Sequence, residues 1–312
     1  MATPAMGISR LKLFFALSRT PHSLLDMATP ILGALLWFEG IPPLWIVGLG
    51  LITVFAGYTA VYALNDVMDY RMDKEKVQLE DTQISADYLD AVLVRHPMAQ
   101  GVLSFKEGLI WSMAWGSLAL MGAFLLNPVC AFIFLWGCAL EAVYCRMLKV
   151  SYFRTLISGV VKTCGCMAAV FAVDPHPSPV FLSILFLWLF TWEIGGQNIP
   201  ADWTDTDVDR TIHAQTIPVR FGPHVANWVI LGMLIATILL NGILIWISPI
   251  DFQFAFVLGT SLLGIYLLFF PALRLFRTRD RKDAMALFNK ASYYPLAMLT
   301  VVLIKRGADF FG

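Results

Sequence analysis

The chain has 312 residues, of which 58% are hydrophobic and only 14% are charged. Soluble domains carry roughly 25% charged residues, so this composition, with a mean hydropathy of +0.71, excludes an ordinary soluble domain and predicts a protein that crosses a lipid bilayer several times. The formal net charge is zero, which leaves no overall basic field and excludes nucleic acid as an expected partner.

Residues 1–20 form a short basic lead that contains Arg10, Lys12 and Arg19. About nine apolar segments follow, each close to the ~20 residues that a helix needs to cross a bilayer. We expect these spans near residues 22–39, 43–66, 105–126, 129–148, 154–173, 179–200, 224–247, 252–275 and 289–308. Residues 1–312 are expected to form one domain, because no linker interrupts the pattern.

The connections between the expected spans fall into two groups. One group contains the N-terminus and residues 67–104, 149–153, 201–223 and 276–288, and the other contains short turns near 40–43, 127–128, 174–178 and 248–251. Nearly all Lys and Arg residues belong to the first group, and basic connections stay on the cytoplasmic side of a membrane. We therefore expect a cell (inner) membrane protein whose N-terminus and long connections are cytoplasmic and whose C-terminus is outside.

A first acidic motif ends the second expected span, with the sequence Asn65-Asp66-Val67-Met68-Asp69-Tyr70-Arg71-Met72-Asp73. On a helix, Asn65, Asp66, Asp69 and Asp73 lie within an arc of about 100°. Four oxygen-bearing side chains would then point the same way at the membrane edge, which suits a hard cation.

The connection after this motif, residues 74–94, is long and acidic. Leu89, Val92 and Leu93 make an apolar stripe at helical spacing, so we expect an amphipathic helix around Ile84–Val94. Such a helix would cover the motif and exclude water from a reactive site.

Among the ionisable residues inside expected spans, we single out Glu141, Lys162 and Glu193. A bare ammonium is costly there, so Lys162 is a candidate functional residue, with snorkelling to the interface as the alternative. Either glutamate could neutralise Lys162, accept a proton from a substrate or pair structurally, and the sequence favours neither.

A second acidic motif ends the sixth expected span, in residues 198–209. Its carboxylates repeat the spacing of the first motif, since Asp202, Asp205 and Asp209 match Asp66, Asp69 and Asp73. On a continuous helix these three aspartates and Asn198 share an arc of about 60°, whereas Asp207 points away and is expected on the solvated surface.

Two facing sets of carboxylates repel each other unless divalent cations neutralise them. Mg²⁺ is typically held by one or two carboxylates together with water and phosphate oxygens, and a ligand set made only of oxygen disfavours zinc or copper. The two motifs therefore predict a diphosphate held between them by magnesium.

Further stretches accompany the two motifs, namely Arg95-His96-Pro97-Met98-Ala99-Gln100-Gly101, Tyr144-Cys145-Arg146-Met147-Leu148-Lys149 and Thr216-Ile217-Pro218-Val219-Arg220-Phe221-Gly222. Together with Asn65-Asp66-x-x-Asp69-x-x-x-Asp73, Asp205-x-x-x-Asp209 and the span layout, they make the chain resemble the UbiA superfamily of intramembrane prenyltransferases. The resemblance covers about residues 20–300. Where some relatives carry another aspartate, this chain has Ala201.

The resemblance implies an all-α integral membrane protein, with about nine transmembrane helices around a central cavity and cytoplasmic cap loops at residues 67–104 and 201–223. It implies Mg²⁺-dependent transfer of a prenyl group from an isoprenyl diphosphate to a small aromatic acceptor, as in quinone or related lipid biosynthesis. By position, the implied metal ligands are Asn65, Asp69, Asp73, Asp205 and Asp209. The other candidate substrate-binding residues are Asp66, Asn198, Asp202 and Tyr144.

Basic residues on the same face are catalytic candidates, because charge-assisted hydrogen bonds would hold a diphosphate. These candidates are Arg71, Arg95 and Lys149, with Lys162 deeper in the fifth span. For Arg71, ordinary positive-inside charge is an equal alternative.

Two other functions fit part of the pattern. Some relatives transfer a phosphoribosyl group from a pyrophosphate donor to a lipid phosphate, and their Tyr-x-x-x-x-Lys pattern resembles Tyr144 to Lys149. A non-enzymatic divalent-cation transporter would also use carboxylates, but transport sites usually lie near the membrane midplane, whereas both motifs lie at one face.

Overall fold

The computed structural model describes residues 9–77, 79 and 93–311, and all regular secondary structure within them is helical. The helices are α1 (Arg10–Leu17), α2 (Thr20–Asp26), α3 (Ala28–Trp37), α4 (Leu44–Val77), α6 (Phe105–Leu126), α7 (Pro128–Arg146), α8 (Arg154–Val173), α9 (Pro179–Trp192), the π-helix η2 (Glu193–Asn198), α10 (Ile199–Thr204), α11 (Thr206–Thr211), α12 (Ile217–Ile247), α13 (Phe254–Gly264), the π-helix η3 (Ile265–Phe269), α14 (Phe270–Thr278), α15 (Arg281–Ser292) and α16 (Tyr294–Phe311).

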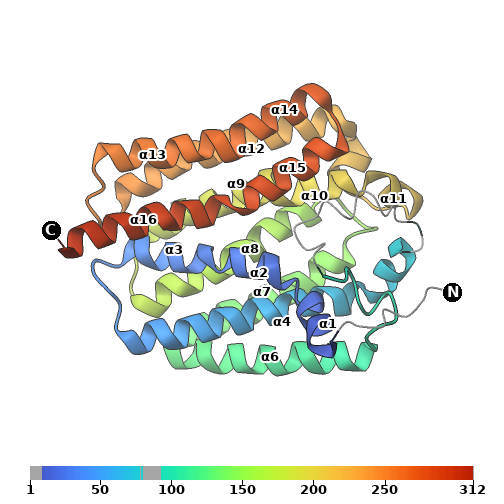
Figure 1. The fold of residues 1–312 in the computed structure, drawn as a ribbon, viewed down its shortest axis with the longest axis horizontal. Helices are drawn as coiled ribbons and strands as arrows, with labels where there is room; N and C mark the ends of the chain where they lie inside the picture. The colour runs from blue at the N-terminus through green and yellow to red at the C-terminus, as the bar shows by residue number, and fades with distance from the viewer. Residues whose placement is uncertain (1–8, 78, 80–92, 312) are drawn as a thin grey trace.

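The long helices lie side by side in one bundle (Figure 1). The helices α4, α6 and α7 form one side of the bundle, α12, α13 and α14 form the opposite side, and α3, α8, α9 and α16 lie between them. The short helices α1, α10 and α11 lie at one end, and α16 finishes at the other. Both acidic motifs therefore belong to the same end of the molecule.

Eight helical segments in the described part of the chain are long and apolar enough to cross a membrane. The first expected span, residues 22–39, is instead broken at Met27 into α2 and α3. Pro30 has no N–H to donate to the Asp26 carbonyl, and the Thr29 hydroxyl donates to that carbonyl at 2.9 Å. With this broken segment counted, the prediction of an all-α membrane protein with about nine spans is confirmed.

Several connections are shorter than the sequence suggests. Residues 67–77 continue α4 as helix, and α10 and α11 make most of residues 201–211 helical. Residues 276–288 are also largely helical, because α14 ends at Thr278 and α15 begins at Arg281. The expected cap loops at 67–104 and 201–223 are thus partly helical. A helix can continue past the apolar segment because each added residue donates a backbone hydrogen bond within the helix.

Small residues let neighbouring helices approach closely, as is usual in membrane bundles. Gly33 of α3 lies so close to Cys166 of α8 that an added Cβ atom would collide with it. Gly122 of α6 lies equally close to Thr53 of α4. The largest cluster of buried apolar side chains comes from α3, α8, α9, α12 and the helices from η3 to α16. Cavities lie beside this core, between α3, α4, α7 and α8.

Candidate active site

Two cavities meet inside the bundle. A polar chamber of about 220 Å³ lies among α4, α8, η2, α10 and residues 93–96, and an apolar chamber of about 1140 Å³ extends along α3, α4, α7 and α8 as far as α16. Six residues, which we call the junction, border both chambers: Arg19, Tyr62, Asn65, Tyr144, Lys162 and Glu193.

The first acidic motif lies on the last turns of α4. Asn65, Asp69 and Asp73 border the polar chamber, as their helical spacing predicts. Asp66 is 3% exposed and points elsewhere, where it accepts a hydrogen bond from Arg19 at 3.0 Å. The motif thus gives three side chains to the chamber and uses the fourth to anchor the segment before α2.

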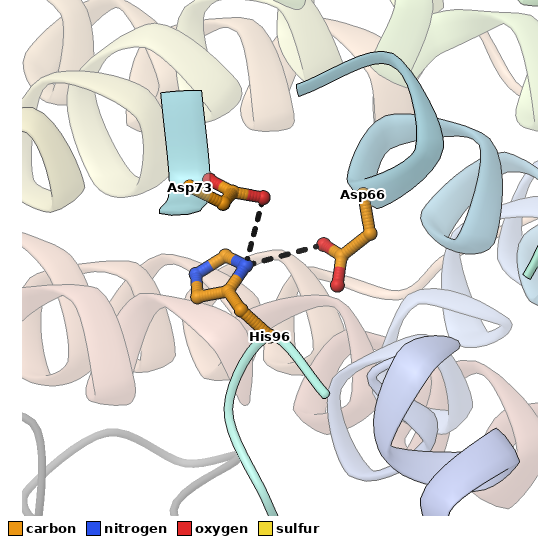
Figure 2. A group of neighbouring side chains, drawn as sticks. All are labelled: Asp66, Asp73 and His96. Atoms are coloured by element: carbon orange, nitrogen blue, oxygen red, sulfur yellow. Dashed lines mark ion pairs between the residues drawn. The ribbon is translucent and has the colours of Figure 1, made fainter. Parts of the chain in front are cut away.

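His96 lies between two carboxylates of this motif (Figure 2). Its Nδ1 atom is 3.0 Å from Asp73 and 3.4 Å from Asp66. Burial opposes protonation of the imidazole, but the Asp73 and Asp66 carboxylates outweigh it and raise the pKa of His96 to about 9. His96 is therefore an imidazolium at neutral pH. The ligand atoms of the three side chains lie within 4.8 Å of one another, a spacing that would also suit a metal ion, but the protonated ring has no free lone pair for one.

The second acidic motif does not form the continuous helix that the sequence suggests. Its residues begin in η2, continue in α10, and reach α11 after a break at Asp205, whose backbone has φ −95° and ψ 6°. Asn198, Asp202 and Asp205 nevertheless border the polar chamber. Asp209 is buried behind them and is 2.8 Å from Lys76, a chamber residue.

Each aspartate of the second motif has a basic partner from a distant part of the chain. The pairs are Asp202 with Arg154 at 2.9 Å, Asp205 with Arg95 at 3.3 Å and Asp209 with Lys76 at 2.8 Å. The two acidic motifs therefore face each other across a layer of cations, which offsets their mutual repulsion.

The pKa values of two of these aspartates shift in opposite directions. Burial favours the neutral form of Asp205, but Arg95, Lys76 and His96 outweigh it and lower its pKa. Burial raises the pKa of Asp209, although Lys76 opposes the shift. Asp205 is the better placed of the two to remain an anion.

Sequence reasoning missed four of the cations at this site: Arg19, Lys76, His96 and Arg154. Lys76 carried a signal, because it follows Asp73 by three residues and shares its helical face. Arg154 carried none, since a basic residue at the start of a span is also ordinary positive-inside charge. It is buried, and its guanidinium lies 4.1 Å from the centre of the Tyr144 ring.

Two of the four basic catalytic candidates lie away from the chambers. Arg71 is exposed, and the Lys149 side chain is 40% exposed and pairs with Glu75 at 3.1 Å. Neither borders either chamber. Arg71 is on the opposite side of α4 from the motif, and Lys149 lies in the turn between α7 and α8. Tyr144 borders the junction without Lys149, so the Tyr-to-Lys pattern does not form one site.

The other two basic candidates do reach the site. Arg95 borders the polar chamber, and Lys162 belongs to the junction. The Lys162 Nζ atom is 2.6 Å from Asp26 and 3.8 Å from Glu193, so its charge is neutralised chiefly by an aspartate that sequence reasoning did not single out. Asp26 also accepts a hydrogen bond from the Tyr62 hydroxyl.

Glu141 and Tyr144 hold two amide side chains of the motifs. The Asn65 Nδ2 atom donates to Glu141 Oε1 at 2.6 Å, and the Asn198 Nδ2 atom donates to the Tyr144 hydroxyl at 3.0 Å. The Asn65 Oδ1 atom accepts a hydrogen bond from Arg19 at 3.1 Å, whereas the buried Asn198 Oδ1 atom has no partner among the described residues. Glu141 borders only the apolar chamber.

Asp207 lies apart from the site and on the surface, as expected, although the continuous helix assumed for that expectation is broken at Asp205. Its side chain is 67% exposed and pairs with Arg281 at 2.5 Å. The amphipathic helix expected around Ile84–Val94 lies almost wholly outside the described residues. Leu93, Val94, Arg95 and His96 are described, and they border the polar chamber.

The arrangement can hold a molecule that is anionic at one end and apolar at the other. Oxygen ligands and cations surround the polar chamber, whereas the apolar chamber is lined mostly by aliphatic and aromatic side chains. The bond between the anionic group and the apolar group of such a molecule would lie at the junction.

The model of the UbiA prenyltransferase family matches residues 27–296. A 4-hydroxybenzoate octaprenyltransferase of Shewanella denitrificans is 25% identical over 232 residues, which cover 73% of this chain and 74% of the relative. A protoheme IX farnesyltransferase of Photobacterium profundum is 25% identical over 289 residues, which cover 89% and 82%.

Solved structures with the same fold include an apo UbiA homolog from Aeropyrum pernix K1, with a TM-score of 0.73, 18% identity, and coverage of 91% of this chain and 98% of that one. A UbiA homolog from Archaeoglobus fulgidus bound to DMAPP and Mg²⁺ has a TM-score of 0.67, 16% identity, and coverage of 93% and 99%. At these identities the likeness shows the fold.

Proposed function

The chain belongs to the UbiA prenyltransferase family and is an integral-membrane prenyltransferase, and we propose that it transfers a prenyl group from an isoprenyl diphosphate to a small aromatic acceptor, with Mg²⁺ as cofactor. We also propose that residues 1–312 form a single domain, and the family match over residues 27–296 supports this for most of the chain. The reaction would supply a prenylated aromatic precursor of a quinone or a related lipid.

The observation that carries this proposal is the meeting of the two chambers. A diphosphate fits the polar chamber, where both acidic motifs and their cations converge, and a prenyl chain fits the apolar chamber. The carbon that joins them would lie at the junction. A carbocation formed there would be shielded from bulk water by the surrounding helices.

The residues of the polar chamber fit magnesium. The ligand atoms are oxygens, which Mg²⁺ prefers, and the buried Asn198 Oδ1 and Asp202 Oδ2 atoms have no hydrogen-bond partner among the described residues. The residues that would hold the metal are Asn65, Asp69 and Asp73 with Asp205 and Asp209, assisted by Asn198 and Asp202. When bound, the metal would neutralise charge on the leaving diphosphate.

The cations of the site would bind the diphosphate directly. Lys76, Arg95 and Arg154 already pair with aspartates of the second motif, so diphosphate oxygens and metal could share these partners. Lys76 and Arg154 would thereby take the role that the sequence suggests for Arg71 and Lys149.

Two features support the nature of the substrates. Relatives named for octaprenyl and farnesyl transfer support an isoprenyl diphosphate donor. A relative named for 4-hydroxybenzoate supports an aromatic acceptor, and the junction offers Tyr62 and Tyr144 as rings against which such an acceptor could pack.

We further propose that the end of the bundle with α1, α10 and α11 faces the cytoplasm of a cell with an inner membrane. Most of the basic residues of the connections lie toward this end, including those of residues 1–20 and residues 274–282. Cytoplasmic diphosphates would then reach the polar chamber without crossing the bilayer.

The test is an assay of purified protein with Mg²⁺, a panel of isoprenyl diphosphates, and 4-hydroxybenzoate, dihydroxynaphthoate and homogentisate as acceptors, with products identified by mass. Asp69→Ala and Asp205→Ala should each lower kcat/KM by about 100-fold or more, because each removes a ligand of the metal that would neutralise the leaving diphosphate. Asp207→Ala is the control and should stay within about threefold of the wild type.

Full turnover by Asp69→Ala and Asp205→Ala, with Asp207→Ala unchanged, would show that the two-motif site does not carry the reaction. Labelled phosphoribosyl diphosphate belongs in the same panel, because a phosphoribosylated product would reveal a different donor.

A further inference from the structure

The junction contains one carboxylate that differs from its neighbours. Glu193 borders both chambers, whereas Asp26 and Glu141 border only the apolar chamber. The Glu193 Oε1 atom accepts a hydrogen bond from the Ser158 hydroxyl at 2.7 Å. Its Oε2 atom is buried and has no hydrogen-bond partner among the described residues.

The other two acids already have strong partners. Asp26 Oδ2 accepts from Lys162 at 2.6 Å and also from the Tyr62 hydroxyl. Glu141 Oε1 accepts from Asn65 Nδ2 at 2.6 Å. A buried carboxylate oxygen without a donor is costly, and Glu193 Oε2 is therefore the acceptor atom of the junction that gains most from a donor brought by a ligand.

The backbone places Glu193 where it can act together with the second acidic motif. Glu193 begins the π-helix η2 and Asn198 ends it. Residues five apart lie on nearly the same face where hydrogen bonds run from i to i+5, whereas an α-helix would set them about 140° apart. The π-helix thus lines up Glu193 at the junction with Asn198 at the polar chamber, and π-helical turns are frequent at functional sites.

Lys162 and Asp26 suit Glu193 to the role of a base. The Lys162 ammonium is 3.8 Å from Glu193 Oε2 but only 2.6 Å from Asp26. The cation is close enough to support a charged carboxylate in a buried site, and it is too far away to occupy the Oε2 atom with a hydrogen bond.

We propose that Glu193 is the general base of the transfer and that its Oε2 atom accepts the hydroxyl proton of the acceptor. The inference rests on the proposed function, because it takes the prenyl carbon to lie at the junction. Ser158 is a positioning residue that holds Oε1 and so directs Oε2 toward the acceptor.

The step balances without any further reactant. The acceptor O–H bond breaks, its electron pair stays with the acceptor, and the proton moves to Glu193. A pair from the acceptor forms the new bond to the prenyl carbon, whose bond to the diphosphate breaks with its electrons leaving on the diphosphate. In a ring-carbon acceptor, the ring then loses its proton to the departing diphosphate, and the hydroxyl oxygen recovers the proton from Glu193.

The test uses Glu193→Gln and Glu193→Asp in the purified full-length protein, and follows two reactions. The first is Mg²⁺-dependent release of diphosphate from geranyl diphosphate without an acceptor, and the second is transfer to the panel acceptor that the wild type prenylates. Glu193→Gln should lower transfer by about 100-fold while diphosphate release changes less than threefold, since general-base catalysis typically contributes 10²–10⁴-fold. Glu193→Asp should recover part of the transfer.

A second readout separates chemistry from structure. A ring-fluorinated derivative of the same acceptor has a more acidic hydroxyl and needs less help from a base, so Glu193→Gln should lose at least about fivefold less activity with it. Glu141→Gln is the matched control, because it neutralises another buried glutamate of the bundle. The transfer rate of Glu141→Gln can be lower than that of the wild type. The ratio of its rates with the fluorinated and the unfluorinated acceptor should equal the wild-type ratio.

Transfer by Glu193→Gln within threefold of the wild type would overturn the proposal, as would an equal loss with both acceptors or a parallel loss of diphosphate release. A failure of the proposed function would look different. In that case Asp69→Ala and Asp205→Ala, which alter the two acidic motifs, would leave diphosphate release at the wild-type rate.

Discussion

At the residue scale, the site is built from carboxylates that distant cations keep in place. His96 is the clearest case, because its ring is held between Asp66 and Asp73 (Figure 2). Its backbone has a φ of 49°, a left-handed conformation that is uncommon outside glycine. The cost of that conformation is offset by two ion pairs in a buried site, so His96 ties residues 93–101 to α4.

The charge of His96 should make folding stability depend on pH. Its pKa is about 9 in the folded protein and about 6.5 in an unfolded chain. Because the folded pKa is the higher one, the stabilisation is complete below about pH 6.5 and is lost as the pH rises through about 9. Without metal, the loss should be about 3 kcal/mol over this range.

Thermal unfolding in detergent with EDTA, from pH 6 to 9.5, measures this effect. The wild type should lose stability toward high pH, and His96→Gln should show a flatter profile because its side chain carries no charge. Parallel profiles for the two proteins would mean that His96 is not charged in the fold.

At the element scale, the π-helix η2 positions Glu193 and Asn198, which both border the polar chamber. It contains Gly195 and Gly196 and packs against α12 and α15. A Cβ atom at Gly195 would lie 2.9 Å from Met233 Cβ and 3.1 Å from the Ile230 carbonyl oxygen. The wider π turn therefore depends on a glycine at its point of closest approach to α12.

Gly195→Ala should lower stability by about 1–3 kcal/mol, because the added methyl group meets backbone that cannot move without shifting α12. Gly232→Ala, on α12 itself, is the control, since nothing lies within 4 Å of its Cβ position. It should be neutral or slightly stabilising. Thermal unfolding measures both, and an equal effect of the two substitutions would show that η2 is not packed as described.

At the scale of the whole molecule, the bundle divides its interior into a small polar space and a large apolar one. The apolar chamber follows α4 from Asn65 back to Ile46 and ends near Arg306 of α16. Arg306 closes that end by donating to the Leu35 carbonyl at 2.8 Å and to the Phe38 carbonyl. The length of this chamber should limit the length of the prenyl chain.

Val54→Trp would place a large side chain about 16 Å along α4 from Asn65. It should lower kcat/KM for long donors such as octaprenyl diphosphate by about 10-fold or more, and leave geranyl diphosphate within about threefold, because only a long chain reaches the filled part. Ile52→Trp is the control on the same helix, since Ile52 is 56% exposed and does not border the chamber.

Turnover of purified variants with donors of increasing length measures this selectivity. Equal losses with short and long donors for Val54→Trp would contradict a chain-holding role for the apolar chamber.

The sequence by itself determined the membrane class, the order and approximate positions of the spans, and the two acidic motifs, because apolar length and helical spacing are local properties that hold wherever a helix forms. Only the tertiary structure decided the partners of the motifs. Lys162 pairs with Asp26 at a separation of 136 residues, and Arg154, His96 and the π turn at Glu193 had no local pattern to mark them. Such pairings depend on which helix faces which across the bundle, and this is set by packing of the whole chain.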